Sequence, residues 1–269
     1  MSYEKEYYEF PGFWSGSALD DEINRIRINT TSLMIPDDCS SLLDVGCGNG
    51  KFIHKVLELR PGMRVIGTDR SQEAIQYLQA EKFVSDIDHL EVNDGFADCI
   101  SCLQVLEHIH DATYHQSLAE LARVAKKYLL ISVPYNEDLK KSFTECPKCL
   151  SNFSWELHMR SYSDEVIDTL FLLFGFKLID KKNIVQYETL AAIDKLQKFR
   201  NLLRPKPIKT FRSPICIICG YKPEQDITTV TSLPSTPFHK DSGWKRQLKK
   251  FWPKKKMNGY WIIALYQRI

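Results

Sequence analysis

Short apolar runs alternate, over the first half of the chain, with longer stretches in which apolar residues recur every three to four positions. The short runs are typical of buried strands and the longer stretches of amphipathic helices. The predicted strands are 41–45, 64–68, 82–85, 98–103 and 128–133, and the predicted helices between them are 50–60, 71–80 and 113–127. Ser71 is the predicted N-cap of the second helix. Strands that alternate with helices predict a parallel sheet covered by helices on both faces.

The second half of the chain continues this pattern less regularly. Ser163 is the predicted N-cap of a helix over 164–174, which Gly175 ends. Predicted strands follow at 176–182 and 260–267. Between them lie a predicted helix at 187–203 and a proline-rich stretch.

The stretch from Leu42 to Phe52, LLDVGCGNGKF, ends an apolar strand in a turn with three glycines. Such a turn leaves backbone N–H groups free to face a nucleotide-like ligand. A nicotinamide or flavin fingerprint requires glycine at the sixth position, where this chain has Lys51. Asp69, 23 residues beyond Gly46, follows the next strand, where an acid binds ribose hydroxyls. A tight turn with a purely structural role is the alternative.

Four motifs in order carry a family resemblance: DVGCGNG at 44–50, GTDRS at 67–71, VSDI at 84–87 and ADCISCLQVLEHI at 97–109. They resemble successive motifs of the class I S-adenosylmethionine-dependent methyltransferases. The resemblance is close over 40–134, extends by pattern to 160–184 and 258–268, and leaves out 185–257. It implies a Rossmann-like α/β fold, a seven-stranded and mostly parallel sheet whose antiparallel last strand pairs with the sixth. The segment 185–257 would then be an insertion.

The resemblance also implies where S-adenosylmethionine binds. Asp44 would hold its ammonium group, Asp69 its ribose, and Asp86 its adenine amino group. For Asp86, a surface acid without a ligand is the alternative. The complete implied set adds the backbone of the glycine turn, two residues against the adenine ring and the end of the fourth strand: Asp44, Gly46, Gly48, Gly50, Asp69, Arg70, Asp86, Ile87, Leu103 and Gln104.

Composition sets limits on the class of protein. With 269 residues, 43% of them hydrophobic, the chain can fill a core without disulfides, and no apolar run approaches the length of a membrane span. A cytoplasmic location is therefore expected. The net charge of +2 conceals an asymmetry, because residues 1–194 hold 19 Lys and Arg against 31 Asp and Glu, whereas 195–257 hold 16 against 3. This basic segment suits an anionic partner or a solvated surface, and its stretch 244–256 also suits a membrane surface.

Two cysteine pairs have the spacing of metal ligands. Cys146 and Cys149 form CPKC, and Cys216 and Cys219 form CIIC. Four thiolates from two such pairs form a closed tetrahedral zinc site, which here would join two distant loops. A cytosolic redox pair and unbonded core cysteines are the alternatives, and His158 is a possible replacement for one thiol. The other cysteines, Cys39, Cys47, Cys99 and Cys102, are predicted to be core residues.

Methyl transfer needs alignment and, for an alcohol acceptor, a base. His108 follows the fourth strand on the ligand side and is the first candidate, with a structural helix-start role as the alternative. His158 is the second, whereas Glu107 is expected to be a cap or a salt-bridge partner. Tyr8 and Trp14 belong to an aromatic N-terminal segment that is predicted to cover the cofactor and line the acceptor pocket; plain surface packing is the alternative.

The sequence thus predicts an enzyme that methylates an oxygen or nitrogen of a small molecule, with a sugar, glycan precursor or natural product favoured. The expected organisation is a lid at 1–40, a cofactor domain at 41–184 and 258–269, and a zinc-bound substrate cap from 135–162 and 185–257. One alternative is an RNA or protein methyltransferase that docks through the zinc and basic insertion. The other is a non-catalytic binding protein with the same fold.

Overall fold

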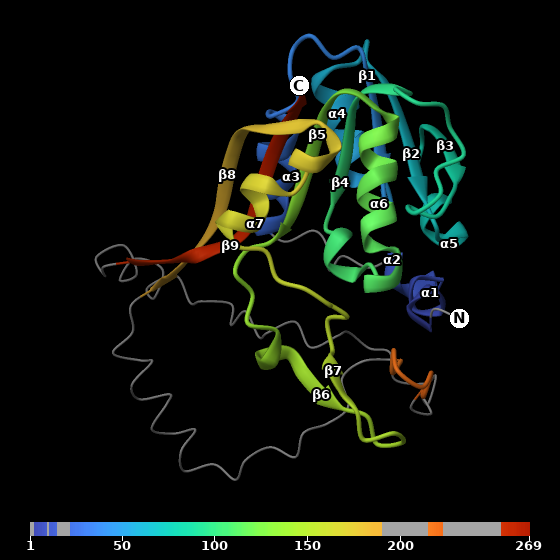
Figure 1. Ribbon diagram of the computed structural model, residues 1–269, viewed down its shortest axis with the longest axis vertical. Helices are drawn as coiled ribbons and strands as arrows, with labels where there is room; N and C mark the ends of the chain where they lie inside the picture. Colours follow the sequence, from blue (N-terminus) through green and yellow to red (C-terminus); the bar gives the residue numbers. More distant parts are fainter. Residues whose placement is uncertain (1–2, 10, 15–21, 190–214, 223–253) are drawn as a thin grey trace, which may run out of the picture.

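The computed structural model describes residues 3–9, 11–14, 22–189, 215–222 and 254–269. The central sheet is built from β1 (Ser41–Val45), β2 (Arg64–Asp69), β3 (Glu81–Val84), β4 (Ala97–Leu103), β5 (Ala125–Pro134), β8 (Phe176–Thr189) and β9 (Lys254–Arg268). Its order is β3-β2-β1-β4-β5-β9-β8 (Figure 1). The first five strands in this order are parallel, and β9 runs antiparallel to both β5 and β8. This confirms the predicted Rossmann-like α/β fold with an antiparallel last strand.

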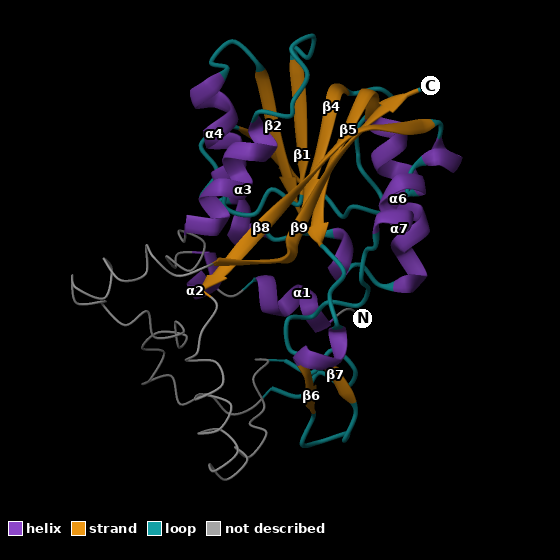
Figure 2. Cartoon of the chain, turned by 90° about the vertical axis from the view of Figure 1, so that its left-hand side faces the viewer, coloured by secondary structure: helices purple, strands orange, loops and turns teal. Residues whose placement is uncertain are grey.

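Helices cover both faces of the sheet (Figure 2). One face carries α3 (Glu22–Ser32) and α4 (Lys51–Leu59), and the other carries α6 (Asp111–Val124) and α7 (Asp164–Thr169). The core accordingly forms two apolar clusters, one on each side of the sheet. Cys99 and Cys102 of β4 are fully buried and belong to opposite clusters, as their three-residue spacing on a strand predicts.

Several elements differ in length from the prediction. The expected helix at 71–80 is only α5 (Gln72–Ile75), because the chain must turn at once into β3. The expected helix at 164–174 is divided into α7 and a 3₁₀ turn, η4 (Leu172–Phe174). The two C-terminal strands are longer than the apolar pattern indicates, since β8 continues to Thr189 and β9 begins at Lys254.

The predicted helix at 187–203 is wrong at its start, because residues 187–189 pair with β9 as part of β8. Its remainder lies outside the described residues. So do residues 195–214 and 223–253, which together include most of the basic segment and Trp244, Phe251 and Trp252. No conclusion about that segment therefore follows from the fold.

A small hairpin lies apart from the main sheet, beyond the carboxyl ends of its parallel strands (Figures 1 and 2). It consists of β6 (Phe143–Glu145) and β7 (Asn152–Ser154), preceded by a 3₁₀ turn, η3 (Leu139–Ser142). The N-terminal helices α1 (Tyr3–Tyr8) and α2 (Pro11–Trp14) lie at the same end of the molecule. The segments predicted to cover the cofactor domain are thus gathered at one edge.

We predict that Gly67→Ala destabilises the protein by about 1 to 3 kcal/mol, because the site is fully packed. A Cβ atom on Gly67 of β2 would lie 2.4 Å from Leu78 Cδ2, 2.8 Å from Ile53 Cδ1 and 2.9 Å from Cys47 Sγ. Gly62→Ala is the matched control, since nothing lies within 4 Å of its added Cβ. Urea unfolding measures both variants. Equal free energies of unfolding would contradict the close approach of Leu78 and of Ile53 in α4 to this strand.

Candidate active site

The glycine turn follows β1 at the point where the strand order reverses between β1 and β4. Gly46, Gly48 and Gly50 have φ values of 75°, 52° and 80°, a left-handed conformation that favours glycine. The N–H groups of Gly46 and Cys47 donate to the Thr68 carbonyl of β2 at 2.8 and 3.0 Å. The turn therefore lies across the carboxyl ends of two neighbouring strands, where ligands bind in sheets of this type.

Asp44 lies beside this turn in the last part of β1. Its side chain is buried, and its Oδ1 atom accepts a hydrogen bond from Ser101 Oγ of β4 at 2.6 Å. Burial raises the pKa of Asp44 to about 7, although the bond from Ser101 opposes the shift. The folded protein thus keeps an acid where its charged form is costly.

Asp69, the last residue of β2, joins the glycine turn to α5. Its two carboxylate oxygens accept hydrogen bonds from the backbone N–H of Gly48 at 2.8 Å and of Ser71 at 2.9 Å. Burial raises the pKa of Asp69 even though both bonds favour its charged form. Ser71 caps α5 by accepting from the N–H of Ala74, as predicted for this position.

The residues predicted for the adenine end lie at the mouth of a pocket of about 320 Å³. Arg70 Nε lies 3.6 Å from Asp86 Oδ1, an ion pair that the sequence did not predict. The residues that line this pocket are Lys5, Arg70, Asp86, Ile87, Asp88, His108, Ile109, His110 and Thr113. The pocket thus connects the predicted adenine residues with the first candidate base, His108.

The end of β4 closes the other side of the turn. Leu103 ends the strand, and Gln104 has a φ of 59° while its N–H donates to the Ser132 carbonyl of β5 at 2.7 Å. The side chain of Val105 lies above Gly46, because a Cβ on that glycine would lie 2.4 Å from Val105 Cγ2. Val105, the residue after Gln104, therefore packs against the glycine turn.

The N-terminal segment covers this edge. A Cβ atom on Gly48 would lie 2.6 Å from Cζ3 of Trp14, so the indole lies directly over the turn. The Tyr8 carbonyl accepts hydrogen bonds from Trp14 Nε1 at 2.6 Å and from Ser71 Oγ at 2.9 Å. The Glu9 carboxylate accepts from the N–H groups that begin α5. The predicted lid is thus fastened to the same residues that form the cofactor edge.

The two candidate bases are brought together although 50 positions separate them in the sequence. The rings of His108 and His158 are 4.8 Å apart, and the Tyr8 ring lies 6.0 Å from that of His108. Nδ1 of His108 lies 3.3 Å from the Leu157 carbonyl oxygen, and burial lowers the pKa of His108 to about 3. His108 is therefore held in its neutral form.

His158 has the opposite electrostatic environment. Burial alone would lower its pKa, but the hydrogen bond with Glu137 and the charges of Glu107 and Glu137 outweigh burial and raise it. Nδ1 of His158 lies 2.6 Å from Glu137 Oε2. One histidine of the pair is thus neutral, while its neighbour is biased toward the charged form.

The expectation that Glu107 is a cap or a salt-bridge partner is wrong. This residue lies in η2 (Leu106–His108), its side chain is completely buried, and neither carboxylate oxygen has a hydrogen-bond partner in the described part of the chain. Burial raises its pKa to about 7, opposed by the charge of His158. The aqueous surroundings assumed for a helix-start glutamate do not exist here.

The four paired cysteines converge in one cluster, with all four sulfurs within 4.8 Å of one another. Cys146 Sγ lies 3.7 Å from Cys219 Sγ, and Cys149 Sγ lies 3.8 Å from Cys216 Sγ. A disulfide needs about 2.05 Å, so the cysteines are unbridged. His158 does not join this cluster, whose four ligand positions are filled by the thiols.

Both pairs adopt the same turn. In each, the N–H four residues after the first cysteine donates to that cysteine's carbonyl, from Leu150 at 2.9 Å and from Gly220 at 2.8 Å. Leu150 and Gly220 are both left-handed, with φ values of 59° and 69°. The two turns therefore present their thiols in equivalent ways, which is the arrangement that one shared ion requires.

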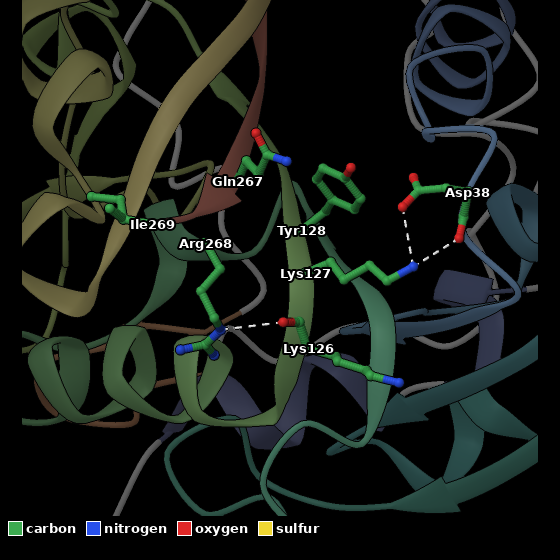
Figure 3. A pocket seen from close by; sticks show the side chains of 7 residues that line it. All are labelled: Asp38, Lys126, Lys127, Tyr128, Gln267, Arg268 and Ile269. Carbon is green, nitrogen blue, oxygen red and sulfur yellow. Dashed lines mark hydrogen bonds and ion pairs between the residues drawn. The ribbon is translucent and has the colours of Figure 1, made fainter.

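A pocket of about 300 Å³ lies at the opposite end of the sheet, where β5 begins and β9 ends (Figure 3). Its cationic side chains already have partners: Lys127 Nζ lies 3.1 Å from Asp38 Oδ2, and Arg268 Nε donates to the Lys126 carbonyl at 3.2 Å. Arg268 also binds the last carbonyls of α6. This pocket lies at the end of the sheet opposite the glycine turn and shares no residue with the candidate site.

Comparison with known proteins decides the family. The family model described as a methyltransferase domain matches residues 16–181, more than half of the chain. The chain belongs to the methyltransferase domain family. The resemblance to the class I S-adenosylmethionine-dependent methyltransferases is thereby confirmed.

Individual relatives match this methyltransferase over shorter stretches. Ubiquinone biosynthesis O-methyltransferase of Thiobacillus denitrificans is 28% identical over 115 residues, which cover 39% of this chain and 48% of that protein. The tRNA (carboxymethyluridine(34)-5-O)-methyltransferase of Arabidopsis thaliana is 34% identical over 100 residues, covering 35% and 24%. The chain thus spans about a quarter to a half of the length of these relatives.

Solved structures share the fold at low identity. A chain in the complex of the Haloferax volcanii Trm112 methyltransferase activator with a proposed methyltransferase has a TM-score of 0.59 at 14% identity, covering 100% of this chain and 98% of that one. Magnesium protoporphyrin IX methyltransferase from Synechocystis PCC 6803, with bound S-adenosylhomocysteine, has a TM-score of 0.52 at 17% identity, covering 67% and 91%. None of the described helices of the present methyltransferase is long and apolar enough to cross a membrane.

Three functional contacts of this methyltransferase were not foreseen from its sequence. Ser101 binds Asp44 across the strands, Glu9 caps α5, and Glu137 holds His158. The contact of Ser101 with Asp44 follows once β1 and β4 are paired, because the parallel register places Ser101 opposite Asp44. No local signal identifies Glu9 or Glu137, since their partners lie far away in the sequence.

Proposed function

We propose that this methyltransferase binds S-adenosylmethionine across the carboxyl ends of β1, β2 and β4 and transfers its methyl group to an oxygen or nitrogen of a small molecule. The observation that carries the acceptor class is the aromatic cover beside the glycine turn. The ring of Trp14 lies over the turn and the ring of Tyr8 lies 6.0 Å from that of His108, so aromatic side chains flank the proposed acceptor position.

Asp44 is proposed to hold the ammonium group of the cofactor, while the backbone at Gly46 and Gly48 passes close to its methionine part and Gly50 opens α4 beside it. Asp44 is buried with one hydrogen bond in place, and a ligand cation would stabilise its charged form. The N–H of Gly48 donates to Asp69, which fixes the carboxylate that is proposed to bind the ribose.

The adenine is proposed to lie in the pocket of about 320 Å³. There Asp86 would accept from its amino group, while Ile87 and Arg70 lie against the ring. Leu103 and Gln104 would contribute backbone contacts, since the adjacent Val105 packs against the glycine turn. The acceptor is placed beside Tyr8, Trp14, His108 and His158, next to the sulfur and methyl of the cofactor. Methyl transfer is then a displacement in line, governed by alignment.

A structural zinc ion is proposed to join Cys146, Cys149, Cys216 and Cys219. A zinc ion about 2.3 Å from four tetrahedral sulfurs keeps them about 3.8 Å apart, which agrees with the observed separations of 3.7 and 3.8 Å. We infer that residues 1–40 form the lid, that 41–184 and 258–269 hold the cofactor, and that this zinc joins parts of 135–162 and 185–257 as a cap.

The affinity for S-adenosylmethionine is predicted to fall about tenfold per pH unit below the Asp44 pKa, because the ammonium group favours the charged carboxylate. That pKa is about 7. Asp44→Asn should bind more weakly at pH 8 and lose most of this slope, leaving the smaller contribution of Asp69. Calorimetric titration at pH 6, 7 and 8 measures both. An unchanged slope in Asp44→Asn would contradict the assignment.

The thermal stability of Asp44→Asn is the control that separates weaker cofactor binding from unfolding. A carboxyl with a raised pKa favours the folded state while protonated, so stability falls as pH rises from about 4 to about 7. Asparagine has no charge to bury. We therefore expect Asp44→Asn to melt at a higher temperature than the wild type at pH 8, which separates weaker binding from unfolding.

The acceptor class is tested with methyl-labelled S-adenosylmethionine and two probes: a metabolite extract below 1 kDa, and total RNA. We expect label in the extract, because aromatic side chains flank the proposed acceptor position. The tRNA-methyltransferase relative supports RNA as the second candidate, with the basic segment as its docking surface. Label in RNA that salt or deletion of residues 245–256 removes would favour that candidate and overturn the first.

Zinc is tested by metal analysis of the purified protein. About one zinc per chain is expected, and Cys219→Ser should lose it and melt at a lower temperature, because the ion joins segments 67 residues apart. Lys148→Ser, exposed in the same turn as Cys149, should keep the metal. A zinc-free protein whose thiols form a disulfide that a reductant opens would favour the redox alternative.

A further inference from the structure

A second group of potential metal ligands lies next to the proposed acceptor position, separate from the thiols. Glu107 and His108 come from η2, directly after β4, and His158 comes from the segment after β7. One carboxylate oxygen and one ring nitrogen of each histidine all lie within 4.8 Å of one another. Two imidazoles and a carboxylate form a ligand set typical of first-row transition metals.

Glu107 provides the observation that points to a cation. Its side chain is completely buried, and both of its oxygens lack a hydrogen-bond partner among the described residues. Burial of a carboxylate without donors is unfavourable unless a positive charge compensates it. The described protein groups leave both oxygens available for such a charge.

The two histidines are oriented as metal ligands commonly are. Nδ1 of His158 is engaged by Glu137 at 2.6 Å, and Nδ1 of His108 faces the Leu157 carbonyl at 3.3 Å. In both rings Nε2 is the nitrogen left for an ion. A carboxylate or carbonyl behind each imidazole is the usual outer shell of a metal site, where it fixes the tautomer and the ring orientation.

The backbone holds the two contributing segments together independently of any ion. The N–H of Met159 donates to the Glu107 carbonyl at 2.7 Å, and Arg160 Nη1 donates to the Leu106 carbonyl at 2.6 Å. Leu157, directly before His158, has a φ of 63°, which is rare for leucine. Strained residues of this kind persist where the surroundings enforce them and are concentrated at functional sites.

We propose that Glu107, His108 and His158 bind a divalent transition-metal ion that coordinates the acceptor hydroxyl. The inference rests on the proposed methyl transfer and narrows its acceptor to an oxygen. Three protein ligands leave open positions, and a bound cation makes a coordinated hydroxyl more acidic. The hydroxyl proton passes to water as the oxygen–carbon bond forms and the carbon–sulfur bond breaks. The products are a methyl ether, S-adenosylhomocysteine and hydronium.

A neighbouring set shares His158 but fits less well. Glu137, Glu156 and His158 also have ligand atoms within 4.8 Å of one another. The Glu137 carboxylate, however, is already bonded to His158, and the Glu156 side chain is 34% exposed to water. The Glu107 carboxylate is neither hydrogen-bonded within the described residues nor exposed to water, so the ion is assigned to the side of His158 that faces Glu107.

The test uses Mn²⁺ on the full-length, zinc-loaded protein. Mn²⁺ prefers nitrogen and oxygen ligands and ranks below zinc in affinity, so it leaves the thiol cluster undisturbed. Electron paramagnetic resonance of free Mn²⁺ gives the bound fraction without any activity measurement. We expect one saturable Mn²⁺ per chain, whereas the absence of saturable binding would overturn the proposal.

Variants locate the ion. Glu107→Gln and His158→Gln should abolish Mn²⁺ binding, and Glu137→Gln should weaken it by about 10- to 100-fold, because Glu137 acts through His158. Glu91→Gln, an exposed glutamate elsewhere, is the matched control and should bind as the wild type does. If Glu107→Gln binds normally and Glu137→Gln does not, the ion lies on the other side of His158 and the proposal is wrong.

S-adenosylmethionine titration of the same samples separates this proposal from the proposed function. Intact cofactor binding in Glu107→Gln, with a melting temperature no lower than that of the wild type, assigns the loss of Mn²⁺ to the site and not to unfolding. A wild type that binds S-adenosylmethionine but no Mn²⁺ overturns the metal site alone. A wild type that binds Mn²⁺ but no S-adenosylmethionine overturns the proposed function instead.

Discussion

The parallel register of β1 with its two neighbours is the constraint on which the site depends. Asp44 is paired with Gly67 of β2 on one side and with Ser101 of β4 on the other. Strands that run in the same direction end at the same edge, so their terminal polar residues meet there whatever their distance in sequence. The hydrogen bond from Ser101 and the N–H groups that reach Asp69 follow from this register. A shift of β1 by one residue relative to its neighbours would turn the Asp44 side chain to the other face of the sheet.

A second link holds the acceptor side, which the sheet does not reach. The cysteine cluster forms a small apolar core of its own with Phe153 and Leu157, and Tyr7 of α1 packs against it. Lys222 beside the second cysteine pair forms an ion pair with Glu6 of α1. Leu157 directly precedes His158. The cysteine cluster thus packs against the residue before His158 and against α1, although no cysteine lines the pocket of about 320 Å³.

Local patterns were sufficient to predict the features that local sequence encodes. The bounds of β1, the three left-handed glycines and the N-caps at Ser71 and Ser163 follow from apolar period and backbone preference. The convergence of the cysteine pairs was also predictable, because their spacing is itself a chemical signal. Element lengths were not, since β8 continues to Thr189 only because β9 pairs with it. Propensity contains no information about such a partner.

Glu107 shows the limit of sequence interpretation most clearly. A glutamate at a helix start is ordinarily solvated, and only tertiary packing reveals that this one is buried. Burial raises its pKa to about 7, the same value that burial gives Asp44. The two acids lie at successive strand ends, β1 and β4, and each costs stability in its charged form. A cation beside either carboxylate would offset that cost. We propose the ammonium group of the cofactor for Asp44 and a metal ion for Glu107.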